Sequence, residues 1–123
     1  MTSAIALQEQ NATHWNNRCW YRTGAGLLRE AVADCNEALR LIPTLPHALD
    51  SRGAAHLKLG QLDNAIADYD AALRLAPRNA SSLFGRGVAR RLKGDAAGAE
   101  ADIAAARSLD KSIDARMAHY GIK

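Results

Sequence analysis

The sequence lacks the features of a membrane or secreted protein. It contains no run of 18 apolar residues, so no membrane-spanning helix is expected. It also lacks a basic N-terminal region followed by an apolar run, so no secretory signal is expected. These two absences predict a soluble protein of the cytoplasm that has no membrane partner.

Motifs of catalysis and cofactor binding are missing as well. The four histidines have no metal-ligand spacing and no suitably spaced partner cysteines. No glycine-rich phosphate loop follows a strand, and the sequence shows no recognisable motif that pairs a nucleophile with a neighbouring base. The sequence therefore predicts a protein that is not an enzyme and that uses no metal and no cofactor.

A strong excess of one charge is also absent. The net charge of +3 is too small to indicate nucleic-acid binding by itself. Arg90, Arg91 and Lys93 form a small basic patch, for which a solvated helix end is the favoured interpretation and phosphate or RNA contact the lesser one. We therefore do not expect a nucleic-acid partner.

What the sequence does contain is a repeat of 34 residues, present in three copies at 12–45, 46–79 and 80–113. Many positions match at this one shift, without a gap. The matching columns include Gly26/Gly60/Gly94, Ala31/Ala65/Ala99, Ala38/Ala72/Ala106, Arg18/Arg52/Arg86, Asp34/Asp68/Asp102 and Cys19/Gly53/Gly87. Chance does not align so many columns, so the chain is built from one repeated structural unit.

Each copy has the pattern of two amphipathic helices joined by a tight turn. The glycine of the first column suits the left-handed residue that ends a helix, and Pro43 and Pro77 end the second helices. A helix pair cannot bury its apolar stripe alone, so the three copies are expected to stack. The predicted helices cover 13–24, 28–41, 47–59, 62–75, 81–93, 96–108 and 112–120.

The repeat resembles the tetratricopeptide repeat (TPR) family. The residues that carry the resemblance most clearly are Leu49, Gly53, Gly60, Ala65, Tyr69, Ala72 and Pro77. The first copy departs at Cys19, where the family prefers Gly, and at Cys35, where it prefers an aromatic residue; the third departs at Ile103 and Lys111. The resemblance implies an all-α, right-handed α-solenoid of three TPR helix-turn-helix repeats and a C-terminal capping helix.

The segments outside the repeats are short. Residues 1–11 match no repeat column and are expected to be a flexible arm or a loose helical extension. Glu100 and Arg107 stand where earlier copies have apolar residues, so no full fourth copy is expected to cover that surface. Residues 114–123 are therefore predicted to form a capping helix and tail.

The resemblance further implies a binding groove on the concave side, lined by the first helix of each pair. The implied groove residues are Asn16, Asn17, Trp20, Thr23, His47, Asp50, Ser51, Ala54, Leu57, Lys58, Ser81, Phe84, Val88, Arg91 and Leu92. The partner-binding residues selected from this set are Asn16, Asn17, Trp20, Asp50, Leu57, Phe84, Val88 and Arg91. The expected function is a non-catalytic scaffold or adaptor that binds a peptide or amphipathic helix of another protein.

Other interpretations of this face stay open. Trp20 and Phe84 can instead tuck between neighbouring helices, and the face can serve self-association into a homo-oligomer or docking within a larger assembly. Some family members hold the acidic C-termini of heat-shock chaperones with cationic side chains. The matching places here are Asn16, Trp20, Ser51, Ser81 and Gly85. Because none of these is cationic, chaperone binding is disfavoured.

Two further features are expected to be structural. The arginine and aspartate columns are predicted to pair across helices, because both repeat with the fold. Cys19 and Cys35 face each other in the family's geometry, so a disulfide is conceivable. Two buried, reduced thiols are nevertheless the favoured expectation in a cytoplasmic protein.

Overall fold

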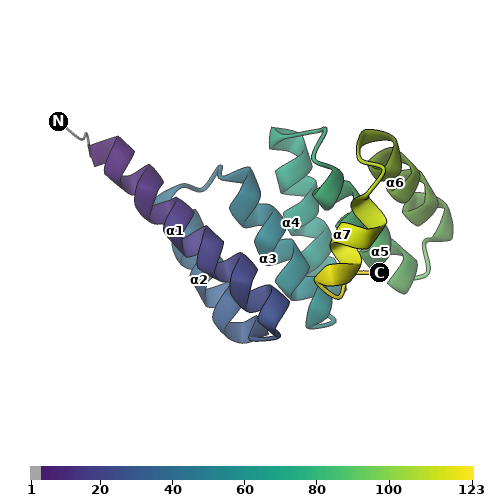
Figure 1. Cartoon of the computed structure of the whole chain (residues 1–123), viewed down its shortest axis with the longest axis horizontal. Helices are drawn as coiled ribbons and strands as arrows, with labels where there is room; N and C mark the ends of the chain where they lie inside the picture. The colour runs from purple at the N-terminus through teal and green to yellow at the C-terminus, as the bar shows by residue number, and fades with distance from the viewer. Residues whose placement is uncertain (1–3) are drawn as a thin grey trace.

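The computed structural model describes residues 4–123, and within them it is all-α, with no strand (Figure 1). The helices are α1 (Ala4–Ala25), α2 (Leu28–Leu41), α3 (Pro46–Lys58), α4 (Leu62–Leu75), α5 (Ala80–Leu92), α6 (Ala96–Leu109) and α7 (Ile113–His119). The expected fold class and the helix-turn-helix order are thereby confirmed. None of these helices combines the length and the apolar character that crossing a membrane requires.

The helices pack as three successive hairpins, α1/α2, α3/α4 and α5/α6, which stack side by side (Figure 1). The turn inside each hairpin contains a glycine with positive φ: 83° at Gly26, 78° at Gly60 and 92° at Gly94. This left-handed conformation is costly for other residues and lets the next amide return to the open helix end, as Leu27 N does to the Arg22 carbonyl at 2.9 Å. The glycines therefore end the first helices, as predicted.

The two helices of a hairpin approach closely where a glycine faces a large side chain. A Cβ added to Gly53 would lie 3.0 Å from the Tyr69 ring, and one added to Gly87 would lie 2.7 Å from Ile103 Cγ1. These contacts belong to one core of buried residues that runs from α3 to the tail of the chain. The small-residue column is therefore what permits close packing of the second and third hairpins.

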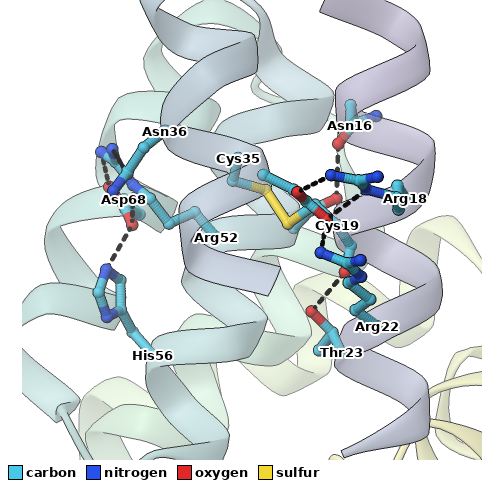
Figure 2. Close-up of a disulfide and its surroundings, with 12 residues drawn as sticks. Asn16, Arg18, Cys19, Arg22, Thr23, Cys35, Asn36, Arg52, His56 and Asp68 are labelled. Atoms are coloured by element: carbon cyan, nitrogen blue, oxygen red, sulfur yellow. Dashed lines mark hydrogen bonds and ion pairs between the residues drawn. A yellow bond between two sulfur atoms is a disulfide. The ribbon is translucent and has the colours of Figure 1, made fainter. Parts of the chain in front are cut away.

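In the first hairpin, Cys19 stands at the position equivalent to Gly53 and Cys35 at the position equivalent to Tyr69. These two cysteines are joined in a disulfide (Figure 2). Their Cα atoms are 5.5 Å apart, within the ordinary range for a disulfide, and both residues are fully buried. The expectation of two reduced thiols is wrong. The reason is geometric, because the hairpin brings these two positions into contact. The two cysteines occupy the space that Gly53 and Tyr69 fill in the second hairpin and Gly87 and Ile103 fill in the third.

The arginine and aspartate columns pair across each hairpin, as predicted. The shortest contacts are Arg18–Asp34 at 2.8 Å, Arg52–Asp68 at 2.7 Å and Arg86–Asp102 at 2.8 Å. Each aspartate also lies near a second residue on the first helix, namely Arg22, His56 or Arg90. Because the carboxylates are buried, these partners compensate charges that would otherwise be costly to bury.

Residues 4–11 form the first turns of α1, which agrees with the expected helical extension and not with the flexible arm. Residues 1–3 lie outside the described residues. Their side chains are exposed, including Ile5 at 69% and Leu7 at 51%. This part of α1 projects beyond α2, toward the N-terminus (Figure 1). At the other end, α7 lies in front of α5 rather than beyond α6 (Figure 1).

Candidate partner-binding groove

An open pocket lies between the first helices of the three hairpins and α7. We call it the polar pocket, and its volume is about 750 Å³. Its lining residues are Thr13, Asn16, Asn17, Trp20, Leu45, His47, Asp50, Ser51, Ala76, Arg78, Asn79, Ser81 and Arg116. Amides, hydroxyls and charged groups predominate among these side chains, so the pocket is suited to hydrogen bonding.

Hydrogen bonds between neighbouring hairpins hold the floor of the polar pocket in place. Ser51 Oγ on α3 donates to Asn16 Oδ1 on α1 at 2.8 Å. Asp50, also on α3, accepts from Ser81 Oγ at 3.0 Å and from Ser82 Oγ at 2.8 Å, both on α5. The floor is thus a polar network that links all three hairpins and positions its side chains in advance of any ligand.

Asp50 is the buried acid of this floor, with 8% of its surface exposed. Burial raises the pKa of its carboxyl above the ordinary value, although the bonds from Ser82 and Ser81 and the nearby His47 and Arg116 act in the opposite direction. The charged carboxylate is therefore less favoured here than in water. Both of its oxygens already accept from serine hydroxyls, so Asp50 acts within the floor network.

Basic residues stand at the rim of the pocket. His47 and Arg78 are exposed, and Arg78 has no ion-pair partner within residues 4–123. Arg116 of α7 is paired with Asp110. The rim thus has at least one arginine whose charge a ligand can meet directly, next to a floor of amides and hydroxyls.

Four of the residues predicted to bind a partner line the polar pocket: Asn16, Asn17, Trp20 and Asp50. The apolar members of the prediction do not. Leu57, Phe84 and Val88 are only 6%, 4% and 3% exposed and belong to the main core. In this conformation they do not line an open groove, because they pack in one buried cluster with Ile113, Met117 and Ile122. Their role in partner binding stays a prediction.

Arg91 is also among the residues predicted to bind a partner, but it does not line the polar pocket. It is exposed and lines a separate depression of about 340 Å³ against α6, together with Glu100 and Arg107. Arg91 lies in the last turn of α5. The sequence periodicity correctly places Arg91 on the first helix of its pair. Periodicity does not show that this turn of α5 lies beside α6 and away from the polar pocket.

Several lining residues were missed by the sequence prediction. Arg78 and Asn79 lie in the linker between α4 and α5, and Arg116 lies on α7, so none belongs to the repeated first-helix positions from which the groove was inferred. The only signal in the sequence was position, since Arg78 directly follows the proline that ends the second copy. Linker residues at a repeat junction should therefore be counted as possible groove residues.

Trp20 lies at the boundary between the polar pocket and the half of the inner face that packs against Ile113, Met117 and Ile122. Its ring lies against that of Tyr120, with centroids 4.5 Å apart and an interplanar angle of 50°. A second pocket of about 550 Å³ adjoins this pair and is lined in part by Tyr21 and His119. The partly buried Trp20 thus leaves an aromatic surface between the two pockets.

The arrangement offers groups that suit the recognition of a ligand. No group of three or more histidine, cysteine, aspartate or glutamate side chains in the described part of the chain is placed to hold a metal ion. The polar pocket contributes hydrogen-bond donors, acceptors and cationic charge, which are the groups that recognise a peptide backbone and its polar side chains.

Comparison with known proteins supports the fold. The family model described as TPR repeat matches residues 53–94. A search of curated protein sequences found no match. Solved structures with the same fold include the Arabidopsis OM64 TPR domain, which is 20% identical with a TM-score of 0.82 over 93% of this chain and 94% of that one.

Two other similar structures are complexes. The first TPR of Spaghetti (RPAP3) bound to the HSP90 peptide SRMEEVD is 18% identical, with a TM-score of 0.79 and 92% of each chain covered. The TPR2B domain of yeast Sti1, in a complex with pHsp70, is 21% identical, with a TM-score of 0.74, 94% of this chain and 90% of that chain covered. At these identities the likeness establishes the fold alone.

Proposed function

The chain has the fold of a tetratricopeptide repeat domain and matches the TPR repeat across 53–94, and from this premise we propose that it is a non-catalytic protein-interaction module. It binds a peptide segment of another protein in the polar pocket. The similar structures in complexes with chaperone peptides support binding of this general kind. The chemistry of the partner follows from the residues of this chain.

The observation that carries the proposal is the combination of an ordered floor and an open rim. Asn16, Ser51 and Asp50 are already held by hydrogen bonds between hairpins, so binding requires little further ordering of the protein. Asn17 and Arg78 are exposed and free to contact a ligand. The pocket therefore suits a polar peptide segment with at least one acidic group near Arg78.

The acidic chaperone terminus is not the expected ligand. The places at which related domains use cationic side chains hold Ser51 and Ser81 here, and both hydroxyls donate within the floor network. A carboxylate bound at these places would lack a cation and would displace existing hydrogen bonds. We therefore expect the peptide SRMEEVD, the ligand in one similar structure, to bind weakly.

The test is selection of ligands from a random dodecamer peptide library displayed on phage, followed by calorimetric titration of the best synthetic peptide. The double variant Asn17→Ala/Arg78→Ala is expected to bind that peptide at least about tenfold more weakly than the wild type, because it removes exposed contacts without touching the floor. SRMEEVD is titrated in parallel.

The matched control is Arg74→Ala. Arg74 is an exposed arginine on α4 outside the polar pocket, so its loss should change the affinity less than about twofold. Selected peptides that bind the double variant as tightly as the wild type would refute the assignment of the pocket. Failure to select any peptide would refute the proposed function itself.

A further inference from the structure

The segment after α6 packs back onto the three hairpins, in addition to ending the array. We call residues 113–122 the strap. Its three buried apolar residues, Ile113, Met117 and Ile122, are 0%, 2% and 1% exposed. They belong to the same cluster as the residues that the sequence assigned to an open groove. The strap therefore occupies the apolar half of the partner-binding face.

The strap also returns to the first hairpin. Gly121, with a φ of 78°, turns the chain after α7, and Ile122 N donates to the Met117 carbonyl at 3.0 Å. Tyr120 reaches α1, where it lies against Trp20, and a Cβ on Gly24 would be 3.2 Å from its ring. Contacts of the strap thus extend across the face from the third hairpin to the first.

Lys58 joins the strap to the hairpins it crosses. Its Nζ donates to the Tyr120 carbonyl at 2.8 Å and to the Thr23 carbonyl at 3.0 Å. One side chain of α3 therefore holds both the strap and the end of α1. Since it binds only main-chain carbonyls of these segments, it holds the strap by hydrogen bonds alone. The ion pairs of the strap lie elsewhere, between Asp114 and Arg107 of α6 and between Arg116 and Asp110.

Capping alone does not explain this course. A cap covers the outer surface of the last repeat. Yet α6 keeps exposed alanines, among them Ala101 and Ala105, and the depression beside Arg91 stays open. The strap is tied to α6 through the ion pair of Asp114 with Arg107, but it also covers part of the inner face, where the proposed function places a ligand. Its apolar residues and Tyr120 follow a spacing of four, three and two, the pattern of an amphipathic segment laid in a groove.

We propose that the strap is a displaceable internal ligand, and that the partner able to replace it is an amphipathic segment with apolar residues spaced as Ile113, Met117 and Tyr120 are. This inference rests on the proposed function, because it extends the ligand-binding face from the polar pocket to the half that the strap covers. Displacement exposes Leu57, Phe84 and Val88 to the incoming segment. The seven-residue α7 is too short to be stable when released, so opening also unfolds it.

The first test is native-state hydrogen exchange of the full chain, followed by mass spectrometry. Amides of the strap are expected to exchange at least about tenfold faster than those of α5, because the strap opens while the hairpins stay folded. Lys58→Met removes the hydrogen bond to the Tyr120 carbonyl and should accelerate exchange of the strap roughly tenfold further, leaving α5 unchanged. Lys93→Met, which removes an exposed pair with Asp63, is the matched control and should leave the strap unchanged.

Equal exchange rates in the strap and α5, in the wild type and in Lys58→Met alike, would overturn the proposal. That result would mean that the strap leaves the face only when the whole domain unfolds. It would make the strap an ordinary part of the core.

The second test uses the strap's own sequence as the probe. The full chain with Met117→Glu and Ile122→Glu cannot seat its strap, so it should bind a fluorescent peptide of residues 110–123 at least about tenfold more tightly than the wild type, whose own strap competes at high effective concentration. The control probe is the same peptide carrying both Glu substitutions, which should not bind.

Each outcome of the second test decides the question. A folded variant that does not bind the peptide overturns the proposal, and so does a variant that fails to fold, because the strap is then integral to the core. Neither test uses a selected ligand of the polar pocket. Failure here is therefore distinguishable from failure of the proposed function, which depends on Asn17 and Arg78.

Discussion

Tyr69 shows at the scale of one residue how the repeat is packed. Its ring lies against Gly53 within its own hairpin and against Gly85 of the next one, where an added Cβ would be 2.3 Å from the hydroxyl. Two glycines, on α3 and α5, therefore make room for one aromatic ring. The ring is fully buried and joins the second hairpin to the third.

The burial of Tyr69 leaves its hydroxyl without a stabilising hydrogen bond among the described residues. It is buried and has no hydrogen-bond partner among the described residues, and burial together with nearby Asp50 and Asp68 raises the pKa of the phenol well above its ordinary value. A buried donor without a partner is destabilising. We therefore expect Tyr69→Phe to stabilise the domain by about 1 kcal/mol, measured as a higher midpoint in urea unfolding.

Gly85→Ala provides the comparison for that prediction. The added methyl group would overlap the Tyr69 ring and should destabilise the domain by roughly 1–3 kcal/mol. Part of this loss should be recovered in Gly85→Ala/Tyr69→Phe, since the hydroxyl is one of the overlapping atoms. A lower urea midpoint for Tyr69→Phe alone would show that the hydroxyl has a partner after all.

At the scale of the element, the first hairpin differs from the other two. Its disulfide stands where the second hairpin has Gly53 with Tyr69 and the third has Gly87 with Ile103. A covalent bond between α1 and α2 thus takes the place of a packed side chain. This hairpin carries Asn16, Asn17 and Trp20, so the disulfide supports one wall of the polar pocket.

The disulfide should contribute measurably to stability. It closes a loop with a sequence separation of 16, and loops of this size correspond to about 3 kcal/mol in the chain-entropy model. We expect Cys19→Ala/Cys35→Ala to lose roughly that amount in urea unfolding. A reductant should lower the melting temperature of the wild type but not that of the variant.

A repacked hairpin is the control. Cys19→Gly/Cys35→Ile copies the pair found in the third hairpin and should recover part of the stability lost in the double alanine variant. Cys35→Tyr is not suitable, because the place equivalent to Gly85 is Ser51, whose side chain would meet the ring. A wild-type protein insensitive to reductant would show that the disulfide adds no stability.

For the whole molecule, the question is how the stacked hairpins behave as a unit. In a stacked array each repeat depends on its neighbours, and end repeats are the first to loosen. Here the strap connects the third hairpin with the first through Tyr120 and Trp20. The two ends of the array are therefore coupled across the inner face as well as through the stack.

This coupling can be measured because both tryptophans, Trp15 and Trp20, lie in α1. Fluorescence thus follows the first hairpin, whereas far-UV circular dichroism follows all helices. We expect the two urea transitions to coincide in the wild type. In Tyr120→Ala the fluorescence midpoint should fall below the dichroism midpoint by roughly 0.5 M urea, since one aromatic contact is lost at that end.

The control for coupling is Tyr120→Phe, which keeps the ring against Trp20 and should behave as the wild type does. Transitions that already separate in the wild type would contradict the idea that the strap couples the ends. Transitions that stay together in Tyr120→Ala would show that the stacking of α1 on α3 is sufficient by itself.

The sequence by itself determined the features that depend on local order. Helices and their ends follow from apolar periodicity and from Gly26, Gly60 and Gly94, whose conformation is set by the backbone of one residue. The Arg–Asp pairs were also predictable, since both partners repeat with the same period and must meet in every hairpin. A repeated sequence carries its own evidence about contacts within and between neighbouring repeats.

The tertiary structure alone decided which of the inner-face residues are open. Leu57, Phe84 and Val88 stand at positions where the family resemblance implies an open groove, and they are buried in one cluster with Ile113, Met117 and Ile122 of the strap. The contact between Trp20 and Tyr120 joins residues far apart in sequence, and no periodicity relates them. Burial by such a segment depends on where the chain runs after the last repeat, which local patterns do not specify.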